Sequence, residues 1–177
     1  MRNYPVLAAA VAVVALLLAA PLRAPAAAST LPNKPVPVDT KQAAVFLTQL
    51  AAQKAAQLGI KTGKATCPAK VVAKPNAVTR FQCTVPYEGQ LAPYEVTIDT
   101  AKASFDTKPG MAILATRLVV AFVETNVTGV KKVDCGKPKV LIRPAKGTVT
   151  CSVNGGAAVA SVRVEDVEGR ITLTGVV

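Results

Sequence analysis

Apolar residues recur at helical spacing in residues 41–58, a stretch without proline or glycine. They fall on one face of a helix with 3.6 residues per turn, at Leu47, Ala51, Ala55 and Leu58. Asp39 or Thr40 can cap the first turn, and Gly59 follows the last apolar position. The pattern therefore predicts a helix over residues 41–58.

The apolar period then shortens to that of β-strands. Short runs rich in Val, Ile, Thr and aromatic residues are separated by turn residues such as Pro75-Asn76 and Glu88-Gly89. We expect strands at 71–72, 79–85, 94–99 and 104–107. A helix and a sheet that each have one apolar face cover one another, so the helix is expected to lie across this sheet.

The same order of elements begins again after Lys108-Pro109-Gly110. A second helical pattern ends at residues 126–129, and its stripe consists of Met111, Leu114, Leu118, Ala121, Phe122 and Thr125. The other faces of this helix are also apolar, which predicts burial on more than one side and contact with the first domain. Strands are expected at 130–135, 139–143, 148–153, 160–166 and 171–176.

Four cysteines have the same spacing in both halves of the chain. Cys67 and Cys83 enclose fifteen residues, as do Cys135 and Cys151, and the second pair lies sixty-eight positions after the first. Three pairings are possible. The repeat favours Cys67 with Cys83 and Cys135 with Cys151, because each duplicated domain then holds its own disulfide. A four-cysteine metal site is the alternative, but the close Cys-x-x-Cys pairs that zinc sites favour are missing.

These patterns together predict an α+β fold of two tandem small domains, residues 39–108 and residues 109–177. Each domain is expected to have one helix packed on a short, mostly antiparallel sheet and one intradomain disulfide. A bond that closes a loop of this size contributes about 3 kcal/mol, which matters in a domain of about seventy residues with a small core.

The N-terminus has the pattern of a secretory signal peptide over residues 1–28. Arg2 precedes an unbroken apolar run from Val6 to Ala20, and small residues at 26–28 suit cleavage. The run is shorter than the roughly 20 residues that span a bilayer, which favours a signal peptide that is cleaved off. Retention by an uncleaved segment is the alternative. Residues 29–38 contain three prolines and are expected to form an extended, mobile leader. We therefore expect a secreted or cell-envelope protein.

The residues around the cysteines resemble those of a known family. The first copy has Cys67-Pro68, Phe81-Gln82-Cys83-Thr84-Val85, Glu88-Gly89 and Val96-Thr97-Ile98. The second copy has Cys135-Gly136, Val149-Thr150-Cys151-Ser152-Val153, Gly155-Gly156 and Val162-Arg163-Val164. This order is similar to that of the exported actinobacterial family catalogued as domain of unknown function 4333, in two tandem copies over about residues 40–177. The resemblance implies an envelope or secreted location, a helix on a sheet and an intradomain disulfide, and it implies no reaction.

Charge narrows the classes of function. The chain has 21 Lys and Arg against 10 Asp and Glu, a formal net charge of +11, and no histidine. Without an imidazole, a Ser-His-Asp or Cys-His nucleophile cannot be built and the commonest zinc sites lose a ligand, so we expect no enzyme activity, metal or cofactor. Eleven basic residues gather in equivalent segments of the two repeats: Lys61, Lys64, Lys70, Lys74, Arg80, Lys131, Lys132, Lys137, Lys139, Arg143 and Lys146.

A common surface formed by these eleven residues would attract acidic envelope polymers or an anionic lipid surface. The alternative is that they keep exposed sheet edges soluble. Nucleic acid is not expected, since the basic segments hold almost no aromatic residue for base stacking. The expected function is a noncatalytic binding or scaffolding module. The alternative is a protein-interaction or inhibitory module that acts through the apolar second helix or a sheet edge.

Two smaller groups have competing interpretations. Tyr87 and Tyr94 flank a predicted turn, where they either pack across the hairpin or stack on a sugar or peptide. Glu165, Asp166 and Glu168 form the densest acidic group. Calcium sites need a loop of alternating oxygen ligands, so we interpret this group as a strand end and turn.

Overall fold

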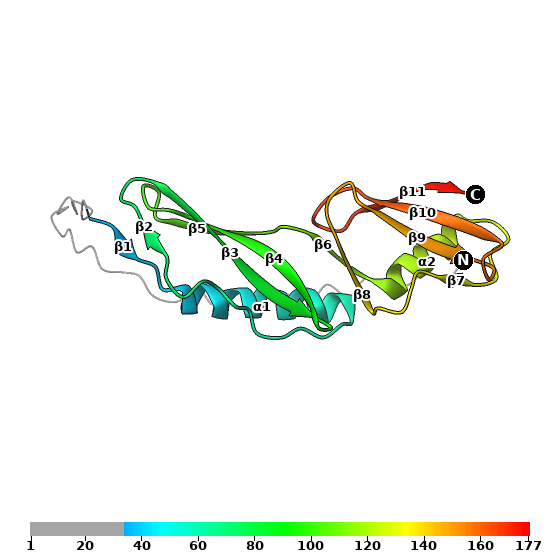
Figure 1. The fold of residues 1–177 in the computed structure, drawn as a ribbon, viewed down its shortest axis with the longest axis horizontal. Coiled ribbons are helices and arrows are strands. Elements are labelled where there is room, and N and C mark those ends of the chain that lie inside the picture. The colour runs from blue at the N-terminus through cyan, green and yellow to red at the C-terminus, as the bar shows by residue number, and fades with distance from the viewer. Residues whose placement is uncertain (1–33) are drawn as a thin grey trace, which may run out of the picture. The chain divides into compact units, whose positions relative to one another are not determined.

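The computed structural model describes residues 34–177 (Figure 1). The predicted signal peptide, residues 1–28, and the start of the leader lie outside the described residues. Within residues 34–177 no helix is both long and apolar enough to cross a membrane. The two repeats belong to one compact unit, Leu31–Val177.

The first repeat consists of a helix, a two-stranded ribbon and a three-stranded sheet. Its elements are β1 (Val36–Pro37), α1 (Thr40–Leu58), β2 (Val72–Ala73), β3 (Val78–Tyr87), β4 (Gln90–Asp99) and β5 (Ser104–Pro109). β1 pairs antiparallel with β2, and β3, β4 and β5 form an antiparallel sheet in that order.

The second repeat has the same plan. Its elements are β6 (Ala112–Ala115), α2 (Thr116–Asn126), β7 (Val133–Asp134), β8 (Val140–Arg143), β9 (Thr148–Val153), β10 (Ala158–Val164) and β11 (Ile171–Val176). β6 pairs antiparallel with β8, as β1 does with β2, and the larger sheet has the order β11-β10-β9-β7. All the strands expected from the sequence are present, with ends that differ by a few residues.

The predicted disulfides are both formed, between Cys67 and Cys83 and between Cys135 and Cys151. Each bond ties the segment that follows a helix to the first long strand of the adjoining sheet, β3 or β9. The structure therefore confirms the predicted α+β class, with two small helix-and-sheet domains and one disulfide inside each.

A spacing of sixty-eight residues also relates backbone contacts in the two repeats. Thr66 forms an isolated bridge with Thr84 of β3. The residues sixty-eight positions later, Asp134 and Ser152, pair in the same antiparallel manner as part of β7 and β9. The internal repeat is thus present in strand register as well as in the cysteine spacing.

Helix α1 lies along one face of the β3–β4–β5 sheet (Figure 1). The Asp39 carboxylate accepts the N–H groups of Lys41 and Gln42 at 3.0 and 3.2 Å and so caps the first turn. Gly59 ends the helix in the left-handed conformation, with φ of 61°. The first core combines this helix and sheet through Leu47, Ala51, Ala55, Cys83, Val85, Tyr87, Ala92, Tyr94 and Val96. The predicted helix, its apolar face and both of its ends are confirmed.

Helix α2 is shorter than the sequence predicts. Residues 112–115, expected in its first turn, instead form β6 and pair with β8. The helix begins at Thr116 and buries Val119 and Val123 in the second core. The predicted start at Met111 is wrong because a short run of apolar residues has no period that distinguishes a strand from a helical turn.

The expectation that α2 is buried on more than one side is also wrong. Its buried residues lie on one side, and Leu118 on the outer side is 43% exposed. Contact with the first repeat is made by Arg117 and by the β6–β8 ribbon that adjoins the helix.

The β6–β8 ribbon contributes side chains to both cores. Ile113 of β6 and Val140 of β8 belong to the first core, with the half-buried Ile142 beside them. Their neighbours Leu114 and Leu141 belong to the second core. Because side chains alternate between the two faces of a strand, each face of the ribbon meets a different core. The boundary expected between residues 108 and 109 stays a prediction.

The last part of the predicted leader is extended, as expected, but it is paired with β2 as a strand. Val36 and Pro37 form antiparallel pairs with Ala73 and Val72, and the Val38 N–H donates to the carbonyl of Val71 at 2.9 Å. These residues therefore form β1 of the first repeat, and the expectation of a mobile leader is wrong for residues 36–38.

Tyr87 and Tyr94 point into the first core. Both side chains are buried, and their hydroxyl oxygens lie 2.8 Å apart in a hydrogen bond. This position rules out stacking of their rings on a sugar or peptide at the surface. Burial raises the pKa of both phenols, and the hydrogen bond to Tyr94 raises the pKa of Tyr87 further.

These raised pKa values predict an alkaline unfolding transition. Tyrosine in an unfolded chain ionises near pH 10, whereas the folded protein retains the neutral phenols. The stabilising contribution is complete below about pH 10 and falls as pH rises above it, because ionisation then favours the unfolded chain. We expect the absorbance of tyrosinate at 295 nm to rise together with loss of the far-ultraviolet circular dichroism signal. The third tyrosine, Tyr4, is replaced by phenylalanine for this measurement. Titration of the remaining two near pH 10 with the fold intact would contradict this interpretation.

Candidate anion-binding site

The eleven basic residues predicted to form one surface lie at different places in the fold. Ten are exposed and Arg143 is half-buried. Lys61, Lys64 and Lys70 lie in the segment between α1 and β2, Lys74 follows β2, and Arg80 is in β3. In the second repeat, Lys131 and Lys132 precede β7, Lys137 and Lys139 lie between β7 and β8, Arg143 ends β8, and Lys146 precedes β9.

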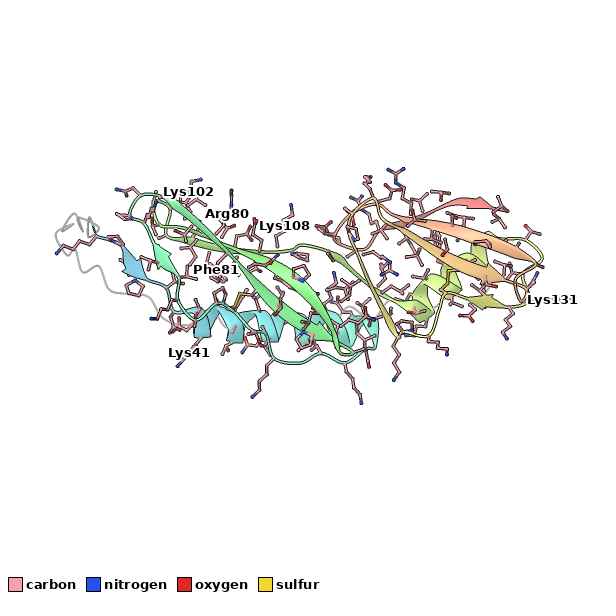
Figure 2. The ribbon with its side chains drawn as sticks, in the orientation of Figure 1. Lys41, Arg80, Phe81, Lys102, Lys108 and Lys131 are labelled. Carbon is pink, nitrogen blue, oxygen red and sulfur yellow. A yellow bond between two sulfur atoms is a disulfide. The ribbon has the colours of Figure 1, made fainter. Side chains whose placement is uncertain are left out.

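Two of the eleven are close to carboxylates. The Arg80 guanidinium lies 3.9 Å from Glu95, and the Lys146 ammonium lies 2.6 Å from Glu165. Arg80 is directed to the same side of the first repeat as Lys102 and Lys108, and Lys41 to the opposite side (Figure 2). Basic residues of the first repeat are therefore present on two sides of it.

Lys137 and Lys139 line the same cavity, which lies where the two repeats meet. It has a volume of about 420 Å³ and is formed by the end of α1, the start of α2 and the segment between β7 and β8. The third cation in its wall is Arg117, and no carboxylate among residues 34–177 lines it. We call this the junction cavity; its lining residues are Gly59, Ile60, Ala115, Thr116, Arg117, Gly136, Lys137, Pro138 and Lys139.

Arg117 joins the ends of the two helices. Its Nη2 donates to the carbonyl oxygen of Leu58, the last residue of α1, at 3.0 Å. A cation is favoured at this helix C-terminus, where carbonyls are unpaired. The same residue is in the first turn of α2, where the helix dipole disfavours positive charge. An anion in the junction cavity would reduce that unfavourable interaction.

Thr116 holds the segment that contains the two lysines. Its N–H donates to the carbonyl of Lys139 at 3.0 Å, and its hydroxyl donates to the carbonyl of Pro138. The disulfide between Cys135 and Cys151 anchors the other end of the segment to β9. The backbone that bears Lys137 and Lys139 is therefore attached at both ends.

The arrangement is suited to binding a phosphate, sulfate or carboxylate. Arg117 offers a planar set of donors, of which one is used by Leu58 among the described contacts, and the lysines offer mobile ammonium groups. Within residues 34–177 neither lysine forms an ion pair. The start of α2 lacks a side-chain cap, so its backbone dipoles add to the positive potential.

A neighbouring hollow at the same junction differs in charge. It has a volume of about 340 Å³ and is lined by α1 residues, including Lys54, together with Glu168 of the second repeat. Burial lowers the pKa of the Lys54 ammonium, and Glu168 and Asp166 oppose that shift. Because both signs of charge are present, this hollow does not favour anions as the junction cavity does.

The acidic group at residues 165–168 is a turn bound to basic partners. Glu165 pairs with Lys146, and Asp166 accepts N–H groups from Gly169 and Arg170. These donors lower the pKa of both carboxyl groups. No set of three or more potential ligands is positioned for a metal ion within the described part of the chain.

Arg117 was not among the residues predicted from the sequence to bind anions. It lies outside the two basic segments, in a stretch from residue 111 to residue 123 whose other residues are apolar except Thr116. A charged side chain in such a stretch indicates a specific polar partner, and this was the signal in the sequence that could have identified Arg117. The position of its partner, Leu58, fifty-nine residues earlier, depends on how the repeats meet.

Gly59 is required for the approach of Arg117 to α1. A Cβ atom at this position would lie 2.6 Å from Arg117 Nη2, and the φ of +61° disfavours any other residue. We expect Gly59→Ala to lower the free energy of unfolding by about 1–2 kcal/mol and to displace the guanidinium. Gly89→Ala is the control, because Gly89 also has a positive φ but open space around it. Urea unfolding and anion affinity should both be measured: equal affinity in the two variants would contradict the role of Gly59.

Comparison of the chain with known proteins gives no match to a family model, a curated protein or a solved structure. The resemblance to the exported actinobacterial family stays a prediction.

Proposed function

We propose that this chain is an exported, noncatalytic module of the cell envelope, related to the actinobacterial family that it resembles, and that it binds acidic envelope polymers at the junction cavity. The observation that supports this most is the convergence of Arg117, Lys137 and Lys139 on one cavity with no carboxylate in its described wall. These residues come from separate parts of the chain. If the basic residues served only to keep the surface soluble, they would not need to meet at one cavity.

The ligand class follows from the geometry of the donors. Arg117 can bind two oxygens of a phosphate or carboxylate at once, whereas the lysines act as point charges. A cavity of about 420 Å³ accommodates one such group and part of the chain attached to it.

The test uses inorganic polyphosphate and polyglutamate as defined polymers. The variant Arg117→Gln/Lys137→Gln/Lys139→Gln removes three charges from the junction cavity. We expect the slope of log affinity against log salt concentration for polyphosphate to decrease by about 2–3, because each lost phosphate contact removes about 0.7–0.9. At about 50 mM salt the affinity should fall at least tenfold.

The matched control removes the same charge elsewhere, with Lys61→Gln/Lys64→Gln/Lys70→Gln. These residues lie in the segment that follows α1 and do not line the junction cavity. We expect the control to retain most of the affinity. Equal losses in the two triple variants would contradict a specific site and support nonspecific attraction by net charge.

A protein-interaction module is the second candidate, and β11 supports it. This strand lies at the edge of its sheet, and residues 171–177 contain no charged side chain. Uncharged edge strands can pair with a strand of another protein. Binding of an envelope protein that persists at about 300 mM salt would favour this function, since apolar and main-chain contacts are less sensitive to salt than ion pairs.

A further inference from the structure

A different cavity, lined mainly by hydrocarbon, lies between the β1–β2 ribbon and one end of the β3–β4–β5 sheet. Its volume is about 420 Å³. An adjoining hollow of about 380 Å³ shares three of its residues and adds Ala43 and Phe46 of α1. We call the two together the ribbon cavity; its main apolar residues are Val36, Val38, Phe46, Ala73, Ile98 and Phe105.

The second repeat shows why the ribbon cavity is open. Val36 pairs with Ala73 in the β1–β2 ribbon. Leu141, sixty-eight positions after Ala73, pairs with Leu114 in the β6–β8 ribbon. The two leucines are 6% and 4% exposed and fill their core. Valine and alanine are smaller, so the equivalent space in the first repeat is left unfilled.

The strands that face the ribbons correspond as well. Ile98 pairs with Phe105 across β4 and β5, and Val164 pairs with Ile171 across β10 and β11. Val164 is fully buried in the second core. Ile98, its counterpart in the first repeat, is only half-buried. Phe105 is 44% exposed, whereas its counterpart Ile171 is half-buried. Phe105 meets Phe46 with ring centroids 5.5 Å apart. Both positions are thus more accessible in the first repeat than in the second.

Exposed apolar side chains are numerous at this end of the first repeat, and three of them, Val36, Phe46 and Phe105, line the ribbon cavity. Half of the large hydrophobic side chains that are exposed in the described residues belong to β1, α1, β2, β3 and β5 near this end of the first repeat: Val36, Val45, Phe46, Val72, Val78 and Phe105. A patch of this kind on a monomer usually marks a binding surface for an apolar ligand, a membrane or a protein.

Basic residues border the same end of the repeat. Lys34 precedes β1, Lys41 is in the first turn of α1, Lys74 follows β2, and Lys102 is in the turn between β4 and β5. Figure 2 shows Lys41 and Lys102 on two sides of this end. All four are exposed, and within residues 34–177 only Lys102 forms an ion pair.

The carboxylates of the two acidic residues that line the cavity accept hydrogen bonds from backbone N–H groups. Asp39 accepts the N–H groups that begin α1. Asp99 accepts N–H groups in the β4–β5 turn and lies 3.4 Å from Lys102. The border of the cavity is therefore positively charged while its wall is apolar.

We propose that the ribbon cavity binds a hydrocarbon chain of an anionic membrane lipid, with the bordering lysines at the lipid head groups. Apolar walls bury methylene groups, and lysines near a surface gain free energy from anionic lipids. A second copy of the chain fits less well, because its own lysines would be brought against these.

Fourteen positions separate Ala20, the end of the apolar N-terminal run, from Lys34. They span at most about 50 Å, so a bilayer that retained the N-terminus would be within reach.

The first experiment places a reporter in the cavity. The chain has no tryptophan, so Phe46→Trp gives a single tryptophan, which can be excited at 295 nm without exciting the tyrosines. Leu91→Trp is the control, because Leu91 is also exposed and lies seven residues from Ile98 along β4, about 23 Å away. Vesicles of phosphatidylglycerol or phosphatidylcholine with brominated acyl chains quench tryptophan on contact.

We expect brominated phosphatidylglycerol to quench the tryptophan at position 46 and not the one at position 91. Phosphatidylcholine should require roughly tenfold more lipid for the same quenching, since the lysine contribution is absent. Absence of quenching at position 46, equal quenching at both positions, or equal quenching by the two lipids would overturn the proposal.

The second experiment fills the cavity with the residues of the second repeat. Val36→Leu/Ala73→Leu, made together with Phe46→Trp, reproduces the pair Leu114 and Leu141. We expect at least roughly tenfold weaker binding to phosphatidylglycerol vesicles, without a decrease in the thermal midpoint. The Lys131→Gln variant removes an exposed lysine that lines neither cavity and should bind these vesicles as the parent protein does. Undiminished quenching in a folded, filled variant would overturn the proposal.

Discussion

Replacing Ile113 by alanine is expected to lower the free energy of unfolding of the first repeat by about 2–5 kcal/mol, although Ile113 follows that repeat in the sequence. Its side chain is 1% exposed and belongs to the same core as Leu47, Val85 and Tyr87. Alanine leaves a cavity there, because α1 and β4 are held in place by the rest of the core and collapse only in part.

Tyrosine fluorescence during urea unfolding measures this effect. Tyr87 and Tyr94 both lie in the first core, and the chain has no tryptophan to mask their emission. Tyr4, the third tyrosine, is replaced by phenylalanine in all variants. Leu114→Ala is the matched control, since the next side chain of β6 belongs to the second core. A tyrosine transition that is unchanged in Ile113→Ala would show that β6 does not support the first repeat. Equal shifts in both variants would instead show that the two repeats unfold together.

Removal of the first disulfide is expected to have a similar effect. Cys67→Ala/Cys83→Ala frees a loop of fifteen enclosed residues, and the lost constraint on the unfolded chain is worth about 3 kcal/mol. Cys83 is also fully buried in the first core, so loss of its sulfur atom adds a cavity term. We expect a total decrease of about 3–5 kcal/mol in the free energy of unfolding.

The urea midpoint of the tyrosine transition measures this change, and wild-type protein in reductant should show most of it. Cys135→Ala/Cys151→Ala is the counterpart in the second repeat, where Cys151 is buried in the same way. Far-ultraviolet circular dichroism then reports the loss of the second sheet. A tyrosine midpoint that does not move on reduction would mean that the bond between Cys67 and Cys83 is dispensable for the first repeat.

Local signals predicted α1 and the hairpins correctly. Asp39 and Gly59 mark the ends of α1, and Leu47, Ala51 and Ala55 form its buried face. Each of these features depends on residues within a few turns of one another, where side-chain period and capping chemistry dominate. The two disulfides were also predicted correctly. The cysteines have equal spacing in the two halves, and only one pairing gives each domain its own bond.

The β6 strand was predicted as part of α2 because its four apolar residues fit either structure. Its state depends on β8, which lies more than twenty residues later and provides the pairing partner. Both faces of β6 are covered, so no polar side remains in the sequence to show the period of a strand.

The candidate anion site was predicted only in part. Lys137 and Lys139 were identified by their basic segment, but nine other residues were identified with them, and Arg117 was omitted. Composition shows that positive charge is abundant. It does not show which charges share a cavity, since that depends on the contact of Arg117 with the end of α1.

The amino-acid sequence alone determined the repeated plan of helix and sheet, the pairing of the cysteines and the positive charge, because these follow from spacing and composition. The tertiary structure decided that β6 and β8 contribute to both cores and that Arg117 reaches Leu58. It also decided that Val36 and Ala73 leave open a space that Leu114 and Leu141 fill in the second repeat. The physical reason is that a cavity reflects the summed volume of side chains brought together from distant parts of the chain, and no local period encodes that sum.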